Sequence, residues 1–168
     1  MIGYSEVLQT MAAMIIFSVI MMNANRMIHR NTVMQIDGEL EQQVISIGQE
    51  IIEEARTKAY DRVTYNSSTP PTMIPEGFTP SSDFPNNKER HQFIAFEDYH
   101  GYTDTIQTSH GDFIIDVEVF YVDDVNYEEI PNQSTFKKIE VNITSDFLRS
   151  GEQPRGYKLE FIRNYYAE

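Results

Sequence analysis

The chain contains no cysteine among its 168 residues. This absence excludes disulfide bonds, catalysis by a thiol and zinc sites built from thiolates. If the protein works outside the cell, it does so without disulfide cross-links.

Basic residues are scarce, because 13 Lys and Arg face 26 Asp and Glu and give a net charge of −13. Nucleic-acid binding needs basic patches that contact phosphates, and docking on anionic lipid needs Lys and Arg clusters. The sequence therefore excludes nucleic acid as a partner and argues against peripheral binding to a lipid surface. The acidic residues are spread along the chain, which is typical of a solvated surface.

Catalytic motifs are also missing, since the chain has no glycine-rich phosphate loop and no nucleophile elbow. We therefore expect no enzyme activity, no catalytic residue and no cofactor. No stretch matches the calcium-binding loop D-x-[DN]-x-[DN]-G. Asp98 and Asp104 flank loops, and they are the candidates for a calcium site because calcium prefers oxygen ligands.

The dominant feature that is present is an uncharged run, Val7–Asn25. As a helix, nineteen residues at ~1.5 Å each span about 28 Å, close to the ~30 Å of a bilayer's hydrocarbon core. A signal peptide would carry a basic segment before the run, where this chain has Glu6. We therefore predict a helix that can just span a membrane. Arg26 and Arg30 follow the run and, by the positive-inside rule, indicate that the following domain is cytoplasmic.

Beyond the run, apolar residues recur every three or four positions from Val33 to Ala59, which predicts an amphipathic helix over residues 31–60. We expect a bend or local break at Asp37-Gly38, because glycine costs about 1 kcal/mol in a helix interior. An unbroken helix from Tyr4 to Tyr60 would be about 85 Å long, more than the core of a small domain requires.

The rest of the chain divides into a loop and a sheet. Residues 61–111 are rich in proline, serine and glycine, which predicts an irregular loop. Apolar and polar residues alternate in Asp112–Tyr121, Phe136–Ser145 and Tyr157–Tyr165, which predicts strands. The connections between these strands are too short for a crossover helix, so we expect an antiparallel sheet over residues 112–168.

The predicted fold class is α+β, with a hydrophobic stem over residues 1–30 and a head over residues 31–168. In the head, the amphipathic helix covers the apolar face of the small antiparallel sheet. The expected head core consists of the inward-facing residues Val44, Ile47, Ile51, Ala55, Phe113, Ile115, Val117, Val119, Ile139, Val141, Ile143, Leu159 and Phe161.

This layout resembles the type IV pilin and pseudopilin family, in particular its minor-pilin type. The likeness rests on Glu6 near the start of an otherwise uncharged run, on the continuation IGQEIIEEARTKAYD, and on the segments FIIDVEVFYVDD and FKKIEVNITSD. The resemblance implies a structural subunit that polymerises through its N-terminal helix. It implies that the filament core is made by Glu6, Val7, Leu8, Met11, Met14, Ile15, Ile16, Phe17, Val19, Ile20, Met21 and Met22. In the family, the glutamate neutralises the N-terminal amine of a neighbouring subunit.

The resemblance also implies the partners and the location. The precursor would lie in the inner membrane with lipid around its stem, and the membrane machinery for pilus assembly or secretion would add it to a homopolymer at the cell surface. This topology places the N-terminus on the cytoplasmic side, against the indication of the two arginines. The architecture of the whole chain carries more weight than two residues.

Two departures leave alternatives open. No basic leader ending in glycine precedes the run, and Glu6 stands one place beyond the family's fifth position. We therefore expect a chain that is already processed or one that is exported without the usual leader. The alternative functions are a non-polymerising, membrane-anchored component of a type II secretion or type IV pilus assembly complex, and a tethered head that binds calcium or another ligand.

Overall fold

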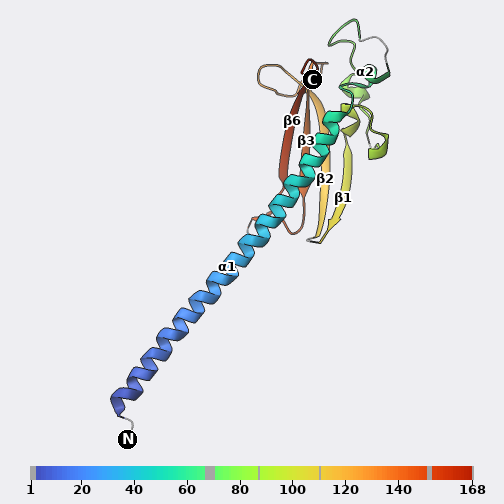
Figure 1. Cartoon of the computed structure of the whole chain (residues 1–168). Helices are drawn as coiled ribbons and strands as arrows, with labels where there is room; N and C mark the ends of the chain where they lie inside the picture. The colour runs from blue at the N-terminus through green and yellow to red at the C-terminus, as the bar shows by residue number, and fades with distance from the viewer. Residues whose placement is uncertain (1–2, 67–70, 87, 110, 151–152, 168) are drawn as a thin grey trace. The chain divides into compact units, whose positions relative to one another are not determined.

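The computed structural model describes residues 3–66, 71–86, 88–109, 111–150 and 153–167. The contacts within the chain define two units, Met1–Glu41 and Gln42–Glu168. A single helix, α1 (Tyr4–Thr57), begins in the first unit and ends in the second (Figure 1).

Helix α1 is continuous through Asp37-Gly38, so the predicted break at this dipeptide is wrong. One glycine costs about 1 kcal/mol, and helical residues on both sides of it propagate the hydrogen-bond pattern across it. A Cβ atom at Gly38 would meet no other atom within 4 Å, so packing does not require glycine here.

The second unit is built on a four-stranded antiparallel sheet with the strand order β1-β2-β3-β6 (Figure 1). The strands are β1 (Tyr102–Thr108), β2 (Gly111–Val122), β3 (Phe136–Thr144) and β6 (Tyr157–Asn164). Val117 pairs with Val141, which pairs in turn with Leu159. A two-stranded hairpin, β4 (Arg149–Ser150) and β5 (Gln153–Pro154), lies in the connection from β3 to β6.

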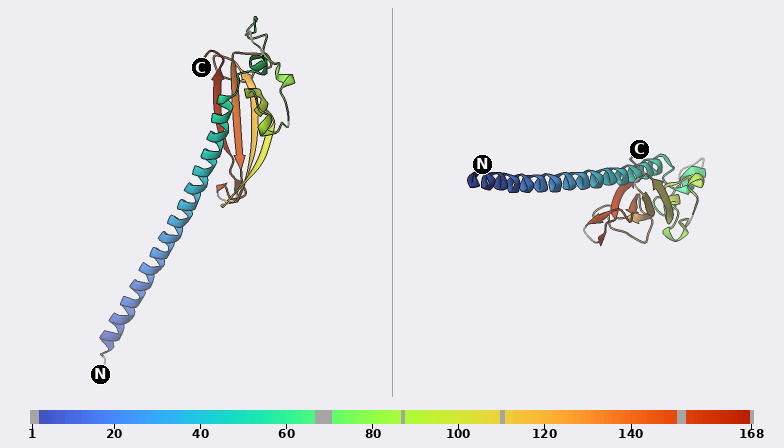
Figure 2. Two further views of the ribbon diagram at one scale, coloured as in Figure 1. Left: turned by 45° about the vertical axis from the view of Figure 1, so that its right-hand side comes forward. Right: turned by 90° about the horizontal axis from the view of Figure 1, so that it is seen from below.

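The predicted α+β class is confirmed, because the C-terminal part of α1 lies along one face of this sheet (Figure 2). Eleven of the expected core residues are at most 9% exposed: Val44, Ile47, Ile51, Ala55, Phe113, Ile115, Val117, Val119, Ile139, Val141 and Ile143. Leu159 and Phe161, on the edge strand β6, are only partly buried. Both still face the helix: a Cβ atom at Gly48 would lie 2.9 Å from Leu159 Cδ1, and the Arg56 guanidinium lies over the Phe161 ring.

The predicted irregular loop over residues 61–111 is wrong in part. It contains helix α2 (Arg62–Asn66), the 3₁₀ helices η1 (Ser81–Asp83), η2 (Arg90–Gln92) and η3 (Phe96–Tyr99), and strand β1. Strand β1 shows little alternation of buried and exposed residues, because only its first residue, Tyr102, is buried. The sequence pattern therefore did not predict this strand. It begins directly after Gly101, whose φ of 69° is a backbone conformation that glycine adopts at no steric cost.

Adjacent isoleucines on β2 provide a matched test of this core. Ile115 is fully buried, whereas its neighbour Ile114 is 54% exposed. We expect Ile115→Ala to lower the free energy of unfolding by about 2–5 kcal/mol, because it removes buried methyl groups and leaves a cavity. We expect Ile114→Ala to change it by less than about 1 kcal/mol. Urea denaturation followed by circular dichroism measures the free energy of unfolding of both variants. Equal losses would contradict the assignment of Ile115 to the buried face of β2 and Ile114 to its exposed face.

Candidate functional site

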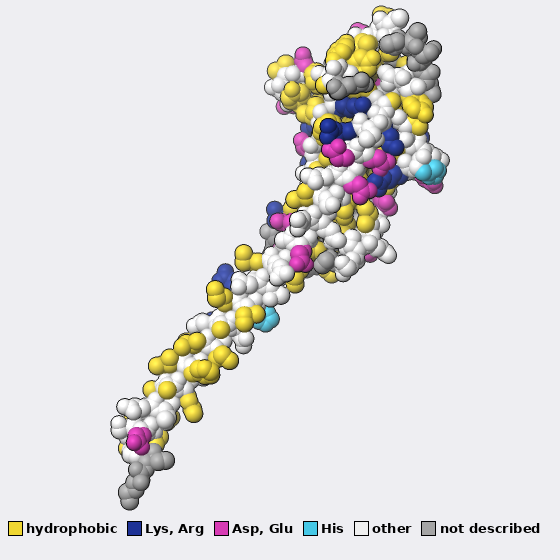
Figure 3. All heavy atoms as spheres, viewed as in Figure 1, with side chains coloured by type: hydrophobic (Ala, Val, Ile, Leu, Met, Phe, Trp, Pro, Cys, Tyr) yellow, Lys and Arg dark blue, Asp and Glu magenta, His cyan; other side chains and the backbone are white. Residues whose placement is uncertain are grey.

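Exposed apolar side chains gather along α1 over residues 7–22 in the first unit (Figure 3). Each large apolar side chain in this segment is 47–70% exposed: Val7, Leu8, Met11, Met14, Ile15, Ile16, Phe17, Val19, Ile20, Met21 and Met22. Together with Glu6, these are the residues that the resemblance to pilins implies for a filament core. We call this segment the apolar stem.

The apolar stem is hydrophobic on every side of the helix. Met14, Ile15, Ile16 and Phe17 follow one another, and successive residues in an α-helix point about 100° apart. Its hydroxyl groups bond to the helix itself: Thr10 Oγ1 donates to Val7 O at 2.9 Å, and Ser18 Oγ donates to Met14 O at 2.8 Å. By length and composition, α1 is able to cross a membrane, a test that signal sequences near an N-terminus also pass.

Glu6 stands in the first turn of α1, where a negative charge opposes the positive pole of the helix dipole. The backbone N–H of Gly3 donates to Glu6 Oε2 at 3.3 Å. Within one chain, the carboxylate therefore has a local role at the start of the helix.

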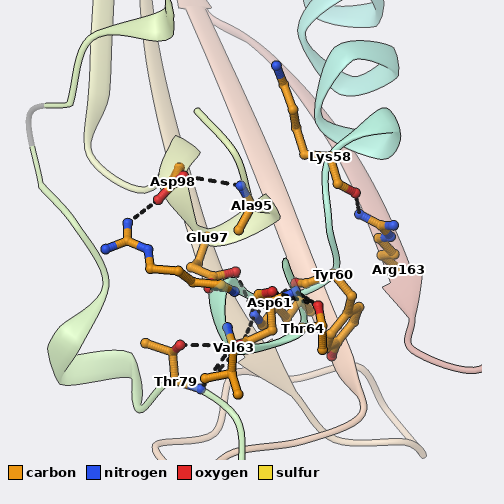
Figure 4. A network of polar contacts seen from close by, with 12 residues as sticks. Lys58, Tyr60, Asp61, Val63, Thr64, Thr79, Ala95, Glu97, Asp98 and Arg163 are labelled. Carbon is orange, nitrogen blue, oxygen red and sulfur yellow. Dashed lines mark hydrogen bonds and ion pairs between the residues drawn. The ribbon is translucent and has the colours of Figure 1, made fainter. Parts of the chain in front are cut away.

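The second unit contains a buried charged cluster that we did not predict from the sequence. Lys137 on β3, Asp61 just after α1 and Glu97 on η3 all have fully buried side chains. Lys137 Nζ donates to Asp61 Oδ2 at 2.7 Å, to Glu97 Oε2 at 2.9 Å and to the Tyr60 carbonyl oxygen at 3.1 Å. We call these three residues the Lys137 cluster. Figure 4 shows Asp61 and Glu97 close together below the end of α1.

Aromatic rings enclose the lysine of this cluster. Its Nζ lies 4.7 Å from the ring centroid of Tyr60, 5.1 Å from that of Tyr121 and 5.3 Å from that of Phe84. Such rings attract a cation through their π faces and exclude water from it.

Asp61 is held by many donors. Its Oδ1 accepts from the Val63 N–H at 3.0 Å and from Thr79 Oγ1 at 2.8 Å, and its Oδ2 accepts from the Tyr121 hydroxyl at 3.3 Å. Burial alone would raise the pKa of Asp61, but the charge and hydrogen bond of Lys137, together with the hydrogen bonds from the Val63 N–H and Thr79, outweigh it and hold this pKa below its ordinary value. The fixed donors therefore stabilise negative charge on this carboxyl group.

Glu97 differs from Asp61 in the direction of its shift. Burial raises the pKa of Glu97, and the nearby negative charge of Asp61 adds to this effect against the opposing charge of Lys137. Its Oε1 accepts from the Arg62 N–H at 2.6 Å. The cluster thus pairs one carboxyl whose pKa is lowered with one whose pKa is raised.

Part of this cluster left a signal in the sequence. Lys137 is in phase with Ile139 and Val141 on β3, so the alternation places its side chain on the buried face. Asp61 and Glu97 left no comparable signal, because they come from separate turns that only the folded chain brings together.

Asp98 and Asp104, the candidates for a calcium site, form hydrogen bonds and ion pairs within the chain. Asp98 is buried, accepts from the N–H groups of Ile94 and Ala95, and forms ion pairs with Arg62 and Lys88. Asp104 accepts from the Tyr102 hydroxyl and the Thr105 N–H, both at 2.8 Å. Among the residues that the structure describes, no group of three or more His, Asp or Glu is placed to hold a metal ion.

Comparison of the chain with protein-family models, with curated proteins and with solved structures finds no match. The resemblance to type IV pilins therefore rests on the residues and motifs quoted above.

Asp98 allows a test of pH dependence. Burial alone would raise its pKa, but the Ile94 N–H, Arg62, Lys88 and the Ala95 N–H outweigh this effect and lower its pKa below the ordinary 3.8. Because the folded pKa is depressed, its stabilising contribution is present above pH 3.8 and is lost as the pH falls through the folded value. We expect Asp98→Asn to cost about 1–3 kcal/mol at pH 7 and less at pH 3.

Urea denaturation at both pH values measures this difference. Asp116→Asn, at an exposed position on β2, is the control and should change stability by less than about 0.5 kcal/mol. A cost for Asp98→Asn that is the same at pH 3 and pH 7 would contradict the assigned ion pairs.

Proposed function

We propose that this protein is a structural subunit that polymerises through the apolar stem into a pilus-like filament. The observation that carries the proposal is that residues 7–22 are apolar on all sides of the helix and remain exposed in the single chain. A helix that is apolar all round is stable only inside lipid or inside a protein bundle. Filament assembly supplies such a bundle from other copies of the same helix.

The next part of α1 favours protein partners over lipid alone. Beyond the apolar stem, Met27, Ile28, Val33, Met34 and Ile36 are 45–71% exposed. Arg26 and Arg30 are interspersed with them, and charged groups at this density do not enter a bilayer core. In a plain anchor these apolar side chains would face water, whereas in a bundle of subunits they gain a neighbour.

The energetics of the proposed assembly are favourable. Burying one large apolar side chain contributes about 1.5–3 kcal/mol, so the side chains of the apolar stem together exceed the estimated 4–15 kcal/mol cost of association. Methionine suits such a core because its unbranched side chain adapts to several different neighbours.

Glu6 and the location complete the proposal. A carboxylate inside an apolar bundle needs a charge partner, and the N-terminal amine of a neighbouring subunit meets this need.

The precursor would be stored in the inner membrane and delivered by membrane machinery to a filament at the cell surface. The ability of α1 to cross a membrane supports the storage step.

The same ability supports the second candidate, a membrane-anchored component of a secretion or pilus assembly complex that does not polymerise. The two candidates differ in what the protein does when detergent is removed. A filament subunit forms fibres, whereas an anchored component forms none.

A charge in the apolar stem tests polymerisation. We expect Ile16→Asp to abolish the pelleting of assembled protein in ultracentrifugation, because each assembled subunit would bury an uncompensated carboxylate. The unfolding of the second unit should stay unchanged. The matched control is Val125→Asp, which places the same charge at a 74% exposed position of the second unit and should assemble normally. Monodisperse wild-type particles without fibres in electron micrographs, with and without detergent, would refute the filament.

Glu6 allows a separate test of subunit addition. We expect Glu6→Gln to slow filament growth at least tenfold, because it removes the charge that partners the neighbouring amine, at about 1.4 kcal/mol per factor of ten. Glu6→Asp keeps the charge and should retain part of the rate. Light scattering during detergent removal measures the growth rate of both variants. An unchanged rate for Glu6→Gln would contradict the pairing of Glu6 with the amine of a neighbouring subunit.

A further inference from the structure

We propose that Lys137 and Asp61 become joined by an amide bond between their side chains, formed within the folded chain with Glu97 as the proton-transfer group. The geometry that points to this reaction is the contact of an amine, a carboxyl and a second carboxyl in one buried cluster. Lys137 Nζ lies 2.7 Å from Asp61 Oδ2 and 2.9 Å from Glu97 Oε2. This bond is independent of filament assembly, because all three residues belong to one chain.

The arrangement holds the nucleophile against the carbon it attacks. The Asp61 Cγ atom is bonded to Oδ2, so the hydrogen bond from Lys137 places the amine next to the carboxyl carbon. The rings of Tyr60, Phe84 and Tyr121 surround the amine, and all three charged side chains are fully buried. Holding two reacting groups in contact converts a slow bimolecular reaction into a unimolecular one.

The other oxygen of Asp61 has donors suited to the intermediate. When the amine attacks Cγ, negative charge develops on one carboxyl oxygen. Oδ1 already accepts from the Val63 N–H at 3.0 Å and from Thr79 Oγ1 at 2.8 Å. Fixed donors of this kind stabilise an oxyanion in acyl transfer.

The reaction balances without any other reactant. The Lys137 ammonium gives one proton to Glu97, which passes it to Asp61 Oδ2, and the neutral amine forms the new C–N bond at Cγ. The amine then loses a second proton to the same oxygen by way of Glu97, and the C–Oδ2 bond breaks. An ammonium and a carboxylate become an amide and one water, nothing is oxidised or reduced, and Glu97 is regenerated. The raised pKa of Glu97 suits it to hold the proton between these steps.

The bond would give this cysteine-free chain a covalent cross-link. It joins two residues 76 positions apart, and it ties the segment after α1 to strand β3 of the sheet. A cross-link that closes a loop of this length restricts the unfolded chain. It would also hold the end of α1 on the sheet when a mechanical force acts along the helix.

Mass spectrometry of the purified full-length protein tests the proposal. We expect the intact mass to fall below the sequence mass by one water, about 18 Da. After unfolding and trypsin digestion, residues 59–62 should be found joined to residues 91–138, because trypsin does not cleave after an acylated Lys137. A folded protein with the full sequence mass and free tryptic peptides ending at Lys137 would overturn the proposal.

Two variants locate the reaction. Lys137→Arg keeps the positive charge but has no reactive amine, and it should have the full mass. Glu97→Gln keeps the side-chain volume and should leave the amide unformed or form it at least a hundredfold more slowly. If Glu97→Gln loses water at the wild-type rate, the proton-transfer role is wrong. If the water loss maps instead to Asp37-Gly38, as a succinimide within one chain segment would give, the cross-link is wrong.

Discussion

A helix that is apolar on every side cannot face water, and this constraint governs the first unit of the protein. The large apolar side chains of residues 7–22 are exposed, yet these residues belong to the same continuous helix whose last turns are buried on the sheet. One element therefore meets two environments. The second unit covers the buried face of residues 44–55, whereas the large side chains of the apolar stem stay exposed in the single chain.

The second unit depends on a different interaction, the Lys137 cluster. Removing three charges from water costs several kcal/mol each, and only close ion pairs and hydrogen bonds offset that cost. Lys137 meets Asp61, Glu97 and three aromatic rings, so each buried charge has partners. The cluster joins the end of α1, the η3 turn and strand β3, which are the elements that anchor the helix to the sheet.

Much of this fold follows from local patterns in the sequence. The period of the apolar residues predicts α1 and strands β2, β3 and β6, and short connections predict their antiparallel order. Strand β1 was not predicted, because it lies at the sheet edge with little buried surface and shows no clear alternation of apolar and polar residues. The helix break predicted at Gly38 was wrong, because the low helix propensity of glycine costs only about 1 kcal/mol and the helical residues on both sides outweigh it.

The functional residues divide in the same way. The apolar stem is visible in the sequence because its signal is a contiguous run. The Lys137 cluster is not, because Glu97 and Asp61 lie 40 and 76 positions from Lys137 and contact it only after folding. The phase of Lys137 with Ile139 marks the lysine as buried but does not identify its partners.

In the proposed filament, copies of the apolar stem bury one another, and cross-linking of single cysteines tests this packing. The chain has no native cysteine, so one cysteine at Met14, Ile15, Ile16 or Phe17 in turn samples all sides of the helix without a background. A disulfide requires Cα atoms about 4.4–6.8 Å apart, which only closely packed helices provide. We predict covalent dimers from at least one position after detergent removal, and no dimers from Val125→Cys in the second unit. Absence of dimers at all four stem positions would contradict it.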